Sequence, residues 1–189
     1  MKSDNQQIIL DTGLSMDIYQ KIPSRNASEQ NTGIEQSFLK HYLDVEVRKT
    51  HLFEGRYENI YLDENHIPEL SPLIKEAVTH AEQLLGLNNL RAGYWFNYMP
   101  PDATTTLHTH DDDDELLSAV YYVNVPENSG NLIIYDDTKN SESPKIEIQS
   151  KTGDFIFFKP DVRHEVSKNN SSEHRLSIGI NFGLDEKQA

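Results

Sequence analysis

The order of its segments predicts a mainly β protein, a β-sandwich or barrel with helices packed outside it. The first half of the chain holds two segments with the apolar period of a helix, and the half after Gly86 alternates with period two. Short clusters of Pro, Gly, Asn and Asp separate the alternating segments, as expected for turns. Helices followed by many short strands are typical of this fold class.

The first predicted helix covers residues 34–47. Ile34, Phe38 and Tyr42 fall four residues apart and form one apolar stripe, with Leu39 and Leu43 beside it. The preceding residues, 1–33, are polar and contain a run, SRNASEQNTG, that is typical of a loop. We therefore expect a core-facing helix that begins after Gly33.

The second predicted helix has clearer ends. Ser71 is the expected N-cap, Pro72 suits the first helical position, and Gly86 supplies the stop. Strands are then expected wherever the period changes to two. Besides a short strand at 56–62, they are 91–99, 116–124, 131–135, 145–149, 154–158 and 174–182.

Composition narrows the possible functions. The chain has 31 acidic and 17 basic residues, a net charge of -14, which argues against a nucleic-acid partner. It has no 18-residue apolar run and no apolar signal segment, so we expect no membrane partner and a cytoplasmic location. Because there is no cysteine, any metal must be held by His, Asp or Glu. The length of 189 residues fits a single domain.

A candidate metal site begins in the sequence His108-Thr109-His110-Asp111-Asp112. On an extended chain, side chains at i and i+2 point the same way and lie roughly 6.6 Å apart, so they can share one ion. Residues at i and i+4 are roughly 13 Å apart, too far on a straight strand. His110 can thus pair with His108 or with Asp112, and it belongs to both alternatives.

A third ligand must come from elsewhere, and His164 follows a predicted strand and loop. Two ligands one residue apart with a distant His is the spacing of the 2-His-1-carboxylate site that leaves iron positions open. A lone His-x-Asp or His-x-His pair is weak evidence, because 8 histidines and 31 acids form such pairs by chance. The remaining histidines lack a partner pattern and are interpreted as structural; among them are His41, His51, His66 and His80.

The last predicted strand supplies an independent signal. Alternation places Arg175 and Ser177 on one face with Gly179 and Asn181, inside an otherwise apolar strand. A buried Arg needs an anion, and its planar fork suits a carboxylate. If no protein carboxylate lies opposite, the carboxylate of a ligand would serve.

Together these residues resemble the 2-oxoglutarate- and Fe(II)-dependent dioxygenases, especially the prolyl-hydroxylase-like branch. The resemblance covers about 91–183 and includes the His pair, the strand that ends in Tyr121-Tyr122-Val123-Asn124, the strand from Gly153 to Phe158, His164 and Arg175. It implies that Arg175 binds the far carboxylate of 2-oxoglutarate. The residues that it implies for help in binding this cosubstrate are Ser177, Tyr122, Ser118 and Tyr98.

The stretch from Pro100 to Val123 is also similar to a bacterial subgroup of 2-oxoglutarate-Fe(II) oxygenases with a His-x-His pattern, although Asp102 and Ala119 stand where that subgroup has glycines. When the chain is aligned with that pattern, His108 is the first ligand and His110 stands in the position of the carboxylate ligand. Two ligand sets therefore remain open. We favour His110, Asp112 and His164, because a carboxylate balances the charge of Fe(II); His108, His110 and His164 are the alternative.

The resemblance implies a double-stranded β-helix core, a jelly roll of the cupin type, over 91–183, with helical support from 1–90. It implies Fe(II), 2-oxoglutarate and O2 as cofactor and cosubstrates. The expected reaction is hydroxylation of a C–H in an amino-acid, peptide or protein substrate, with release of succinate and CO2. The alternatives are a cupin-like metal enzyme that does not use 2-oxoglutarate and a non-catalytic, metal-stabilised binding module.

Overall fold

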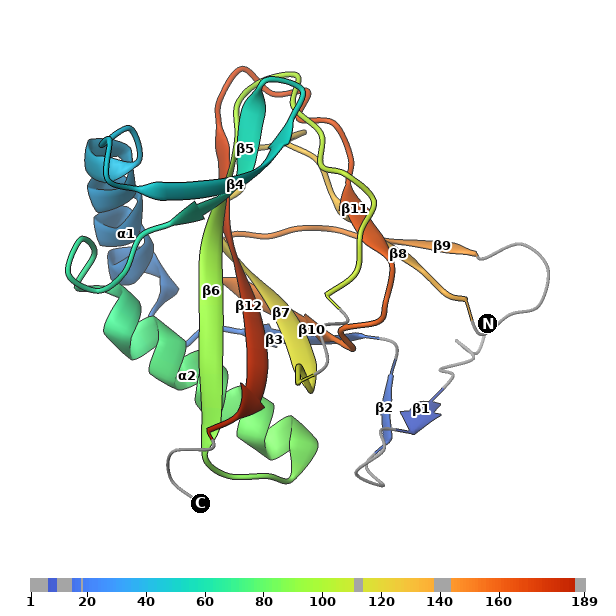
Figure 1. Cartoon of the computed structure of the whole chain (residues 1–189). Helices are drawn as coiled ribbons and strands as arrows, with labels where there is room; N and C mark the ends of the chain where they lie inside the picture. The colour runs from blue at the N-terminus through green and yellow to red at the C-terminus, as the bar shows by residue number, and fades with distance from the viewer. Residues whose placement is uncertain (1–6, 10–14, 18, 111–113, 138–143, 186–189) are drawn as a thin grey trace.

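The computed structural model describes residues 7–9, 15–17, 19–110, 114–137 and 144–185. In this part of the chain, one seven-stranded and one three-stranded antiparallel sheet lie beside two helices (Figure 1). A separate hairpin of β1 (Gln7–Ile9) and β2 (Ser15–Asp17) completes the described elements. The predicted class, mainly β with flanking helices around a double-stranded β-helix, is confirmed.

The larger sheet has the order β3-β10-β7-β12-β6-β5-β4. At its centre β12 pairs with β6 along ten residues and with β7 on its other edge. The strands are β3 (Tyr19–Pro23), β4 (Arg48–Phe53), β5 (Arg56–Tyr61), β6 (Leu90–Met99), β7 (Leu117–Asn124), β10 (Asp154–Phe158) and β12 (Arg175–Leu184).

The smaller sheet has the order β11-β8-β9 and is formed by β8 (Leu132–Tyr135), β9 (Lys145–Ile148) and β11 (His164–Val166). An apolar cluster joins the two sheets: Tyr122 and Phe158 of the larger sheet pack with Leu132 and Ile134 of the smaller one. This apolar cluster therefore bounds the space between the two sheets on one side. The polar residues of β12 face into that space.

The two helices cover the other face of the larger sheet (Figure 1). α1 spans Ala27–His41, so both its start and its end lie earlier in the chain than those of the predicted helix, 34–47. Asn31 explains the early start: its side chain is buried and accepts a 2.6 Å hydrogen bond from the Tyr121 hydroxyl. Because the helix stops at His41, Leu43 is 71% exposed. The prediction that Leu43 lies beside the core-facing stripe of this helix is therefore wrong.

α2 spans Leu70–Leu85 and begins two residues earlier than predicted, so Glu69 rather than Ser71 is the N-cap. It ends as predicted at Gly86, which adopts the left-handed conformation with φ 64°. In the described part of the chain, neither helix is long and apolar enough to cross a membrane.

Side chains of β12 alternate as predicted. Leu176, Ile178, Ile180 and Phe182 join the helix-side core, whereas Arg175 and Ser177 face the interior. The cross-strand register puts Met99 and Asn97 of β6 beside Arg175 and Ser177, so these residues share the interior face.

Five strands were not predicted, namely β1, β2, β3, β4 and β11. β4 and β5 form a hairpin in which β4 is largely exposed, with Leu52 65% exposed, so β4 lacks the alternation of a half-buried strand; β5 buries Glu58 and Ile60. His51 interrupts the pairing of this hairpin and has a positive φ of 57°. Residues 1–90 therefore contribute three strands to the larger sheet in addition to the two helices.

Gly179 of β12 lies directly against the Trp95 side chain of β6. A Cβ added there would lie 2.5 Å from Cε2 and Cζ2 of Trp95, its cross-strand partner. We expect Gly179→Ala to displace the indole and lower the free energy of unfolding by about 1–3 kcal/mol, as overpacking does. Urea unfolding, followed by the fluorescence of Trp95, measures this loss.

Gly93→Ala is the matched control, because Gly93 lies in β6 and nothing is within 4 Å of an added Cβ. Its free energy of unfolding should stay within about 0.5 kcal/mol of the unmodified protein. Equal stability of the two variants would show that Trp95 does not press on β12.

Candidate metal centre

Residues 103–110 leave the larger sheet and run beside β11. The backbone N–H of His108 donates to the carbonyl of His164 at 3.1 Å, and the N–H of His164 donates back to His108 at 3.0 Å. Two residues later, the N–H of His110 donates to the carbonyl of Pro160 at 2.7 Å. This short antiparallel contact brings the two predicted ligand segments together, although neither forms a long strand there.

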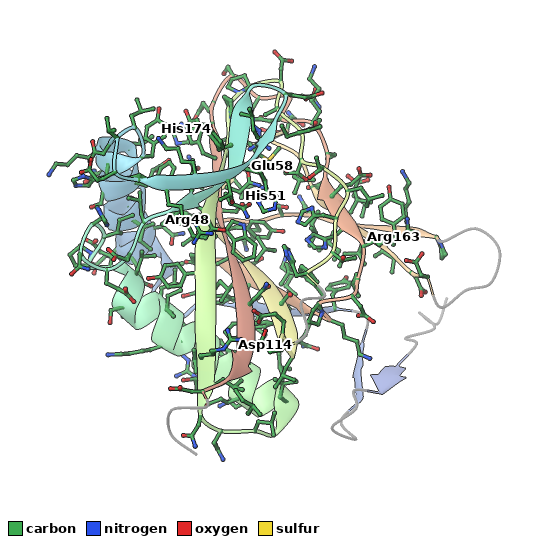
Figure 2. All side chains as sticks on the ribbon, viewed as in Figure 1. Arg48, His51, Glu58, Asp114, Arg163 and His174 are labelled. Carbon is green, nitrogen blue, oxygen red and sulfur yellow. The ribbon has the colours of Figure 1, made fainter. Side chains whose placement is uncertain are left out.

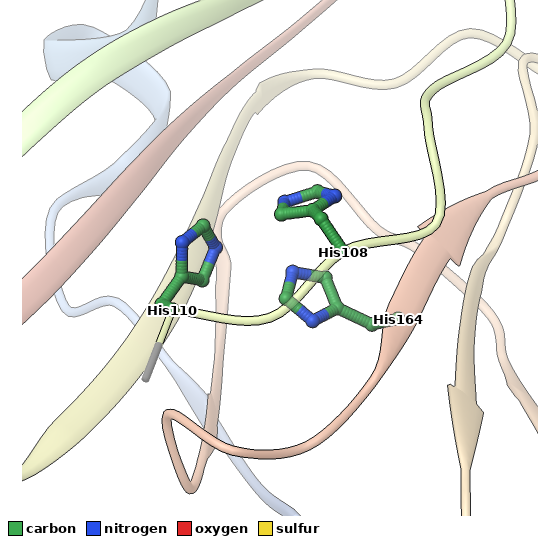
Figure 3. Close-up of side chains that lie close together, drawn as sticks. All are labelled: His108, His110 and His164. Carbon is green, nitrogen blue, oxygen red and sulfur yellow. The ribbon is translucent and has the colours of Figure 1, made fainter. Parts of the chain in front are cut away.

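The three imidazoles of His108, His110 and His164 point toward one another (Figure 3). The ring centroids of His108 and His164 are 4.4 Å apart, and His110 lies 4.8 Å from His108 and 4.9 Å from His164. One ligand atom from each ring lies within 4.8 Å of the others. Asp112, the other predicted ligand, is outside the described residues.

Two of the rings have a defined tautomer. Nδ1 of His108 lies 2.8 Å from the carbonyl of Thr106, and Nδ1 of His164 lies 2.8 Å from the carbonyl of Val162. A carbonyl can only accept, so Nδ1 is the donor in both rings and Nε2 keeps its lone pair. Metal-binding histidines are oriented in this way by outer partners.

Burial also keeps two of the rings neutral. Burial, followed by the neighbouring His164 and His108, lowers the pKa of His110 to about 2. Burial and His108 lower the pKa of His164 to about 4, against the opposing hydrogen bond to Val162. At neutral pH these rings are uncharged nitrogen donors. The donor set therefore fits a divalent transition metal that accepts imidazole.

A buried cation lies on the same interior face. Arg175 is 0% exposed, and its Nη atoms donate to Ser150 at 3.1 Å and to Ser177 at 3.4 Å, with Met99 Sδ at 3.7 Å. Its Cζ lies 5.0 Å from the centre of the Tyr122 ring. No described carboxylate pairs with Arg175. Burial lowers the pKa of this guanidinium, which means that its charged form is destabilised until an anion is near.

Two buried polar atoms at this end also lack a partner. Arg175 Nε and the hydroxyl of Tyr122 are not in hydrogen-bonding geometry with any described residue. Burial raises the pKa of Tyr122, while the nearby Arg175 opposes this shift. Buried polar groups are nearly always satisfied in native proteins, so these atoms indicate a place for a ligand with acceptor oxygens.

The histidines lie between two cavities. A small one of about 50 Å³ reaches from His164 and Phe158 to Ser177 and Gly179. A larger groove of about 300 Å³ lies beneath the β4–β5 hairpin, and its lining includes His51, Asn59 and Tyr61. His108, His110, Trp95 and Asn97 line both.

The structure brings together only some of the residues predicted for cosubstrate binding. Tyr122 and Ser177 lie beside Arg175. Ser118 is not there: it pairs with Asn181 farther along the sheet and donates to its Oδ1 at 2.9 Å. Tyr98 lies on the opposite face, where its ring packs 5.9 Å from Phe38. This corrects the prediction for Tyr98, because the register places Met99, not Tyr98, across from Arg175.

Several residues of the site had no sequence signal. Trp95 and Asn97 share the interior face of β6, and the Trp95 ring lies 5.1 Å from that of His110. Ser150 reaches Arg175 from the turn after β9. His51, interpreted from the sequence as structural, lines the larger groove. Alternation within β6 could have placed Trp95 and Asn97 together, but only the register shows which face is interior.

Comparisons with known proteins agree with this geometry. Residues 93–181 match the model of the family described as "Putative 2OG-Fe(II) oxygenase". No curated protein matches the chain. Among solved structures, a Pseudomonas putida prolyl-4-hydroxylase is similar, with a TM-score of 0.67 and 17% identity over 88% of this chain and 92% of that one.

Two further structures are similar. A prolyl hydroxylase from Trichoplax adhaerens, in complex with a hypoxia inducible factor peptide fragment, has a TM-score of 0.65 and 18% identity over 90% of this chain and 85% of its own. The epimerase SnoN of nogalamycin biosynthesis, in complex with Fe3+, alpha ketoglutarate and nogalamycin RO, has a TM-score of 0.69 and 16% identity over 89% and 79%. At these identities the similarity establishes the fold. Residues 93–181, just under half of the chain, carry the three histidines and Arg175 and are similar to the 2-oxoglutarate- and Fe(II)-dependent oxygenases.

Proposed function

We propose that this oxygenase hydroxylates a C–H of an amino-acid, peptide or protein substrate, with 2-oxoglutarate as cosubstrate and succinate and CO2 as products. One observation carries the proposal: His108 and His110 form the wall shared by a small cavity and a larger groove. The small cavity reaches Ser177, the hydrogen-bond partner of the buried Arg175, and the groove lies on the other side, beneath the β4–β5 hairpin. A cosubstrate and a substrate can thus approach the same three imidazoles from two sides.

His108, His110 and His164 are the residues that we propose as iron ligands. Their ligand atoms are grouped within 4.8 Å, and the Nε2 lone pairs of His108 and His164 are free. When bound, Fe(II) supplies the oxidative chemistry that protein side chains lack. The interior face of the sheet keeps bulk water away from this point, because His164 is only 5% exposed.

Arg175 is proposed to hold the far carboxylate of 2-oxoglutarate. Its fork already points at Ser177 and Ser150, and its Nε and the Tyr122 hydroxyl are available as further donors. A carboxylate here would satisfy both and would neutralise a buried positive charge. Tyr122 and Ser177 are therefore the two additional residues that we assign to the cosubstrate.

The larger groove is proposed to bind the substrate. Its volume of about 300 Å³ suits a small molecule or a single residue of a peptide. Its lining offers the side-chain amides of Asn59, Asn97 and Asn181, which both donate and accept hydrogen bonds, as a peptide group does. A peptide substrate is also consistent with the complex of the Trichoplax prolyl hydroxylase.

The ligand set can be tested by metal titration. Trp95 is the only tryptophan and its ring lies 5.1 Å from His110, so Co(II) bound at the three histidines should quench its fluorescence. We expect His108→Ala to weaken Co(II) binding by more than about 100-fold, beyond the usual effect of outer-sphere changes. Asp112→Asn should leave the affinity within about threefold. The opposite ranking would identify Asp112 as the ligand in place of His108.

The cosubstrate role of Arg175 has a separate readout. Anaerobic addition of Fe(II) and 2-oxoglutarate should give the weak visible absorption of the iron–2-oxoglutarate chelate. Arg175→Ala removes a charge-assisted contact of about 1.5–3 kcal/mol, so the 2-oxoglutarate needed for half-saturation should rise about 10- to 100-fold. Co(II) affinity should hardly change.

Arg25→Ala, which removes an exposed arginine, is the control for that titration and should behave as the unmodified protein. If intact metal binding were accompanied by no visible absorption at all, 2-oxoglutarate would not be the cosubstrate. Unchanged half-saturation in Arg175→Ala would place the carboxylate elsewhere.

A further inference from the structure

The β4–β5 hairpin carries a buried acid that does not face solvent. Glu58 is 5% exposed and binds both polar groups of one residue, Thr106. Its Oε1 accepts the backbone N–H of Thr106 at 2.9 Å, and its Oε2 accepts the Thr106 hydroxyl at 2.6 Å. Figure 2 shows Glu58 and His51 on this hairpin. Burying a carboxylate is costly unless it is fully hydrogen-bonded, so this two-point contact specifies where Thr106 lies.

Thr106 in turn holds a proposed metal ligand. Its carbonyl accepts Nδ1–H of His108 at 2.8 Å, the contact that leaves Nε2 of this ring free. We propose that Glu58 is a positioning residue for the metal centre, which acts through Thr106 to set the ring orientation and tautomer of His108. This inference rests on the proposed function only in taking His108 as a ligand.

Arg56 connects the Glu58 contact to β6 of the larger sheet. Its Nη2 donates to the carbonyl of Thr104 at 2.5 Å and lies 3.5 Å from Glu58 Oε1. Its Nη1 donates to the Asn97 side chain and to the carbonyl of Tyr98, both at 3.2 Å. Arg56 therefore links the hairpin, β6 and the segment that precedes His108.

These side-chain contacts are needed because backbone pairing is sparse here. β5 pairs with β6 only at Ile60 and Phe96 in the described residues. On its other side, the segment is held by β11, where the N–H of Val166 donates to Thr105 Oγ1 at 2.7 Å. Neighbouring residues are thus held from opposite sides, Thr105 by the smaller sheet and Thr106 by the hairpin.

The test compares two acids with matched contacts. Glu76 of α2 also binds a hydroxyl and a backbone N–H, those of Ser24 at 2.8 Å and Arg25 at 3.0 Å, but on the helix side. The variants are Glu58→Ala, the conservative Glu58→Gln and the control Glu76→Ala. Thr106→Val removes only the hydroxyl contact. It tests the same contact if Glu58→Ala does not fold.

Two measurements are made on each variant. In the metal-free protein, long-range ¹H–¹⁵N NMR reports which nitrogen of His108 carries the proton. With Co(II), quenching of Trp95 fluorescence gives the dissociation constant. Thermal unfolding of the metal-free variants separates a loss of stability from a loss of positioning.

We expect His108 in the Nδ1–H tautomer in the unmodified protein and a mixture of tautomers in Glu58→Ala. The Co(II) dissociation constant of Glu58→Ala should rise about 10- to 100-fold, the usual effect of losing an outer partner, with a smaller rise in Thr106→Val. Glu58→Gln can keep both contacts to Thr106, so its constant should stay within about threefold. Glu76→Ala should lower the melting temperature without changing the tautomer or the Co(II) affinity.

An unchanged tautomer and an unchanged Co(II) affinity in both Glu58→Ala and Thr106→Val would overturn the proposal. So would losses in Glu76→Ala equal to those in Glu58→Ala, since they would follow from stability alone. If the unmodified protein did not bind Co(II), the proposed metal site would be wrong, and the tautomer of His108 in the metal-free variants would still decide the role of Glu58.

Discussion

Two reciprocal backbone hydrogen bonds between His108 and His164 hold the site together. Each contributes only about 1 kcal/mol of net stability, yet together they set the relative position of two segments far apart in the sequence. β11 is fastened to the smaller sheet through β8, and that sheet packs on the larger one through the Tyr122–Leu132 cluster. The histidines are therefore fixed relative to Arg175, although they lie on a different sheet. Glu58 and Arg56 hold the segment from the side that β11 does not reach.

Much of this architecture follows from periodicity. The strands β6, β7, β10 and β12 fall close to their predicted ranges, because successive side chains of a strand point to opposite faces of the sheet and the turns between these strands carry clear sequence signals. The interior position of Arg175 follows from the same alternation, since its apolar neighbours Leu176 and Ile178 lie on the helix side. The convergence of His108 and His110 with His164 needed only their spacing and a distant partner.

The parts of the fold and of the site that were not predicted depend on tertiary contacts, which a local sequence pattern does not indicate. Both faces of β6 bear aromatic residues. The alternation along the strand could therefore not show by itself that Tyr98 packs on α1 while Trp95 faces the histidines. β4 is largely exposed and shows no alternation, and the contacts of Arg56 and Glu58 in β5 could not be inferred without the register of this hairpin. The early start of α1 depends on Asn31, a polar residue whose burial is possible only because Tyr121 donates to it.

The central claim is that three imidazoles and one buried guanidinium define the two ends of a single ligand site. A crystal structure with Mn(II) in place of iron and with 2-oxoglutarate tests it most directly. The account predicts Nε2 of His108, His110 and His164 on the metal, and the far carboxylate of 2-oxoglutarate against Arg175 and Tyr122. A metal held by Asp112 with His108 turned away, or a carboxylate bound away from Arg175, would contradict it.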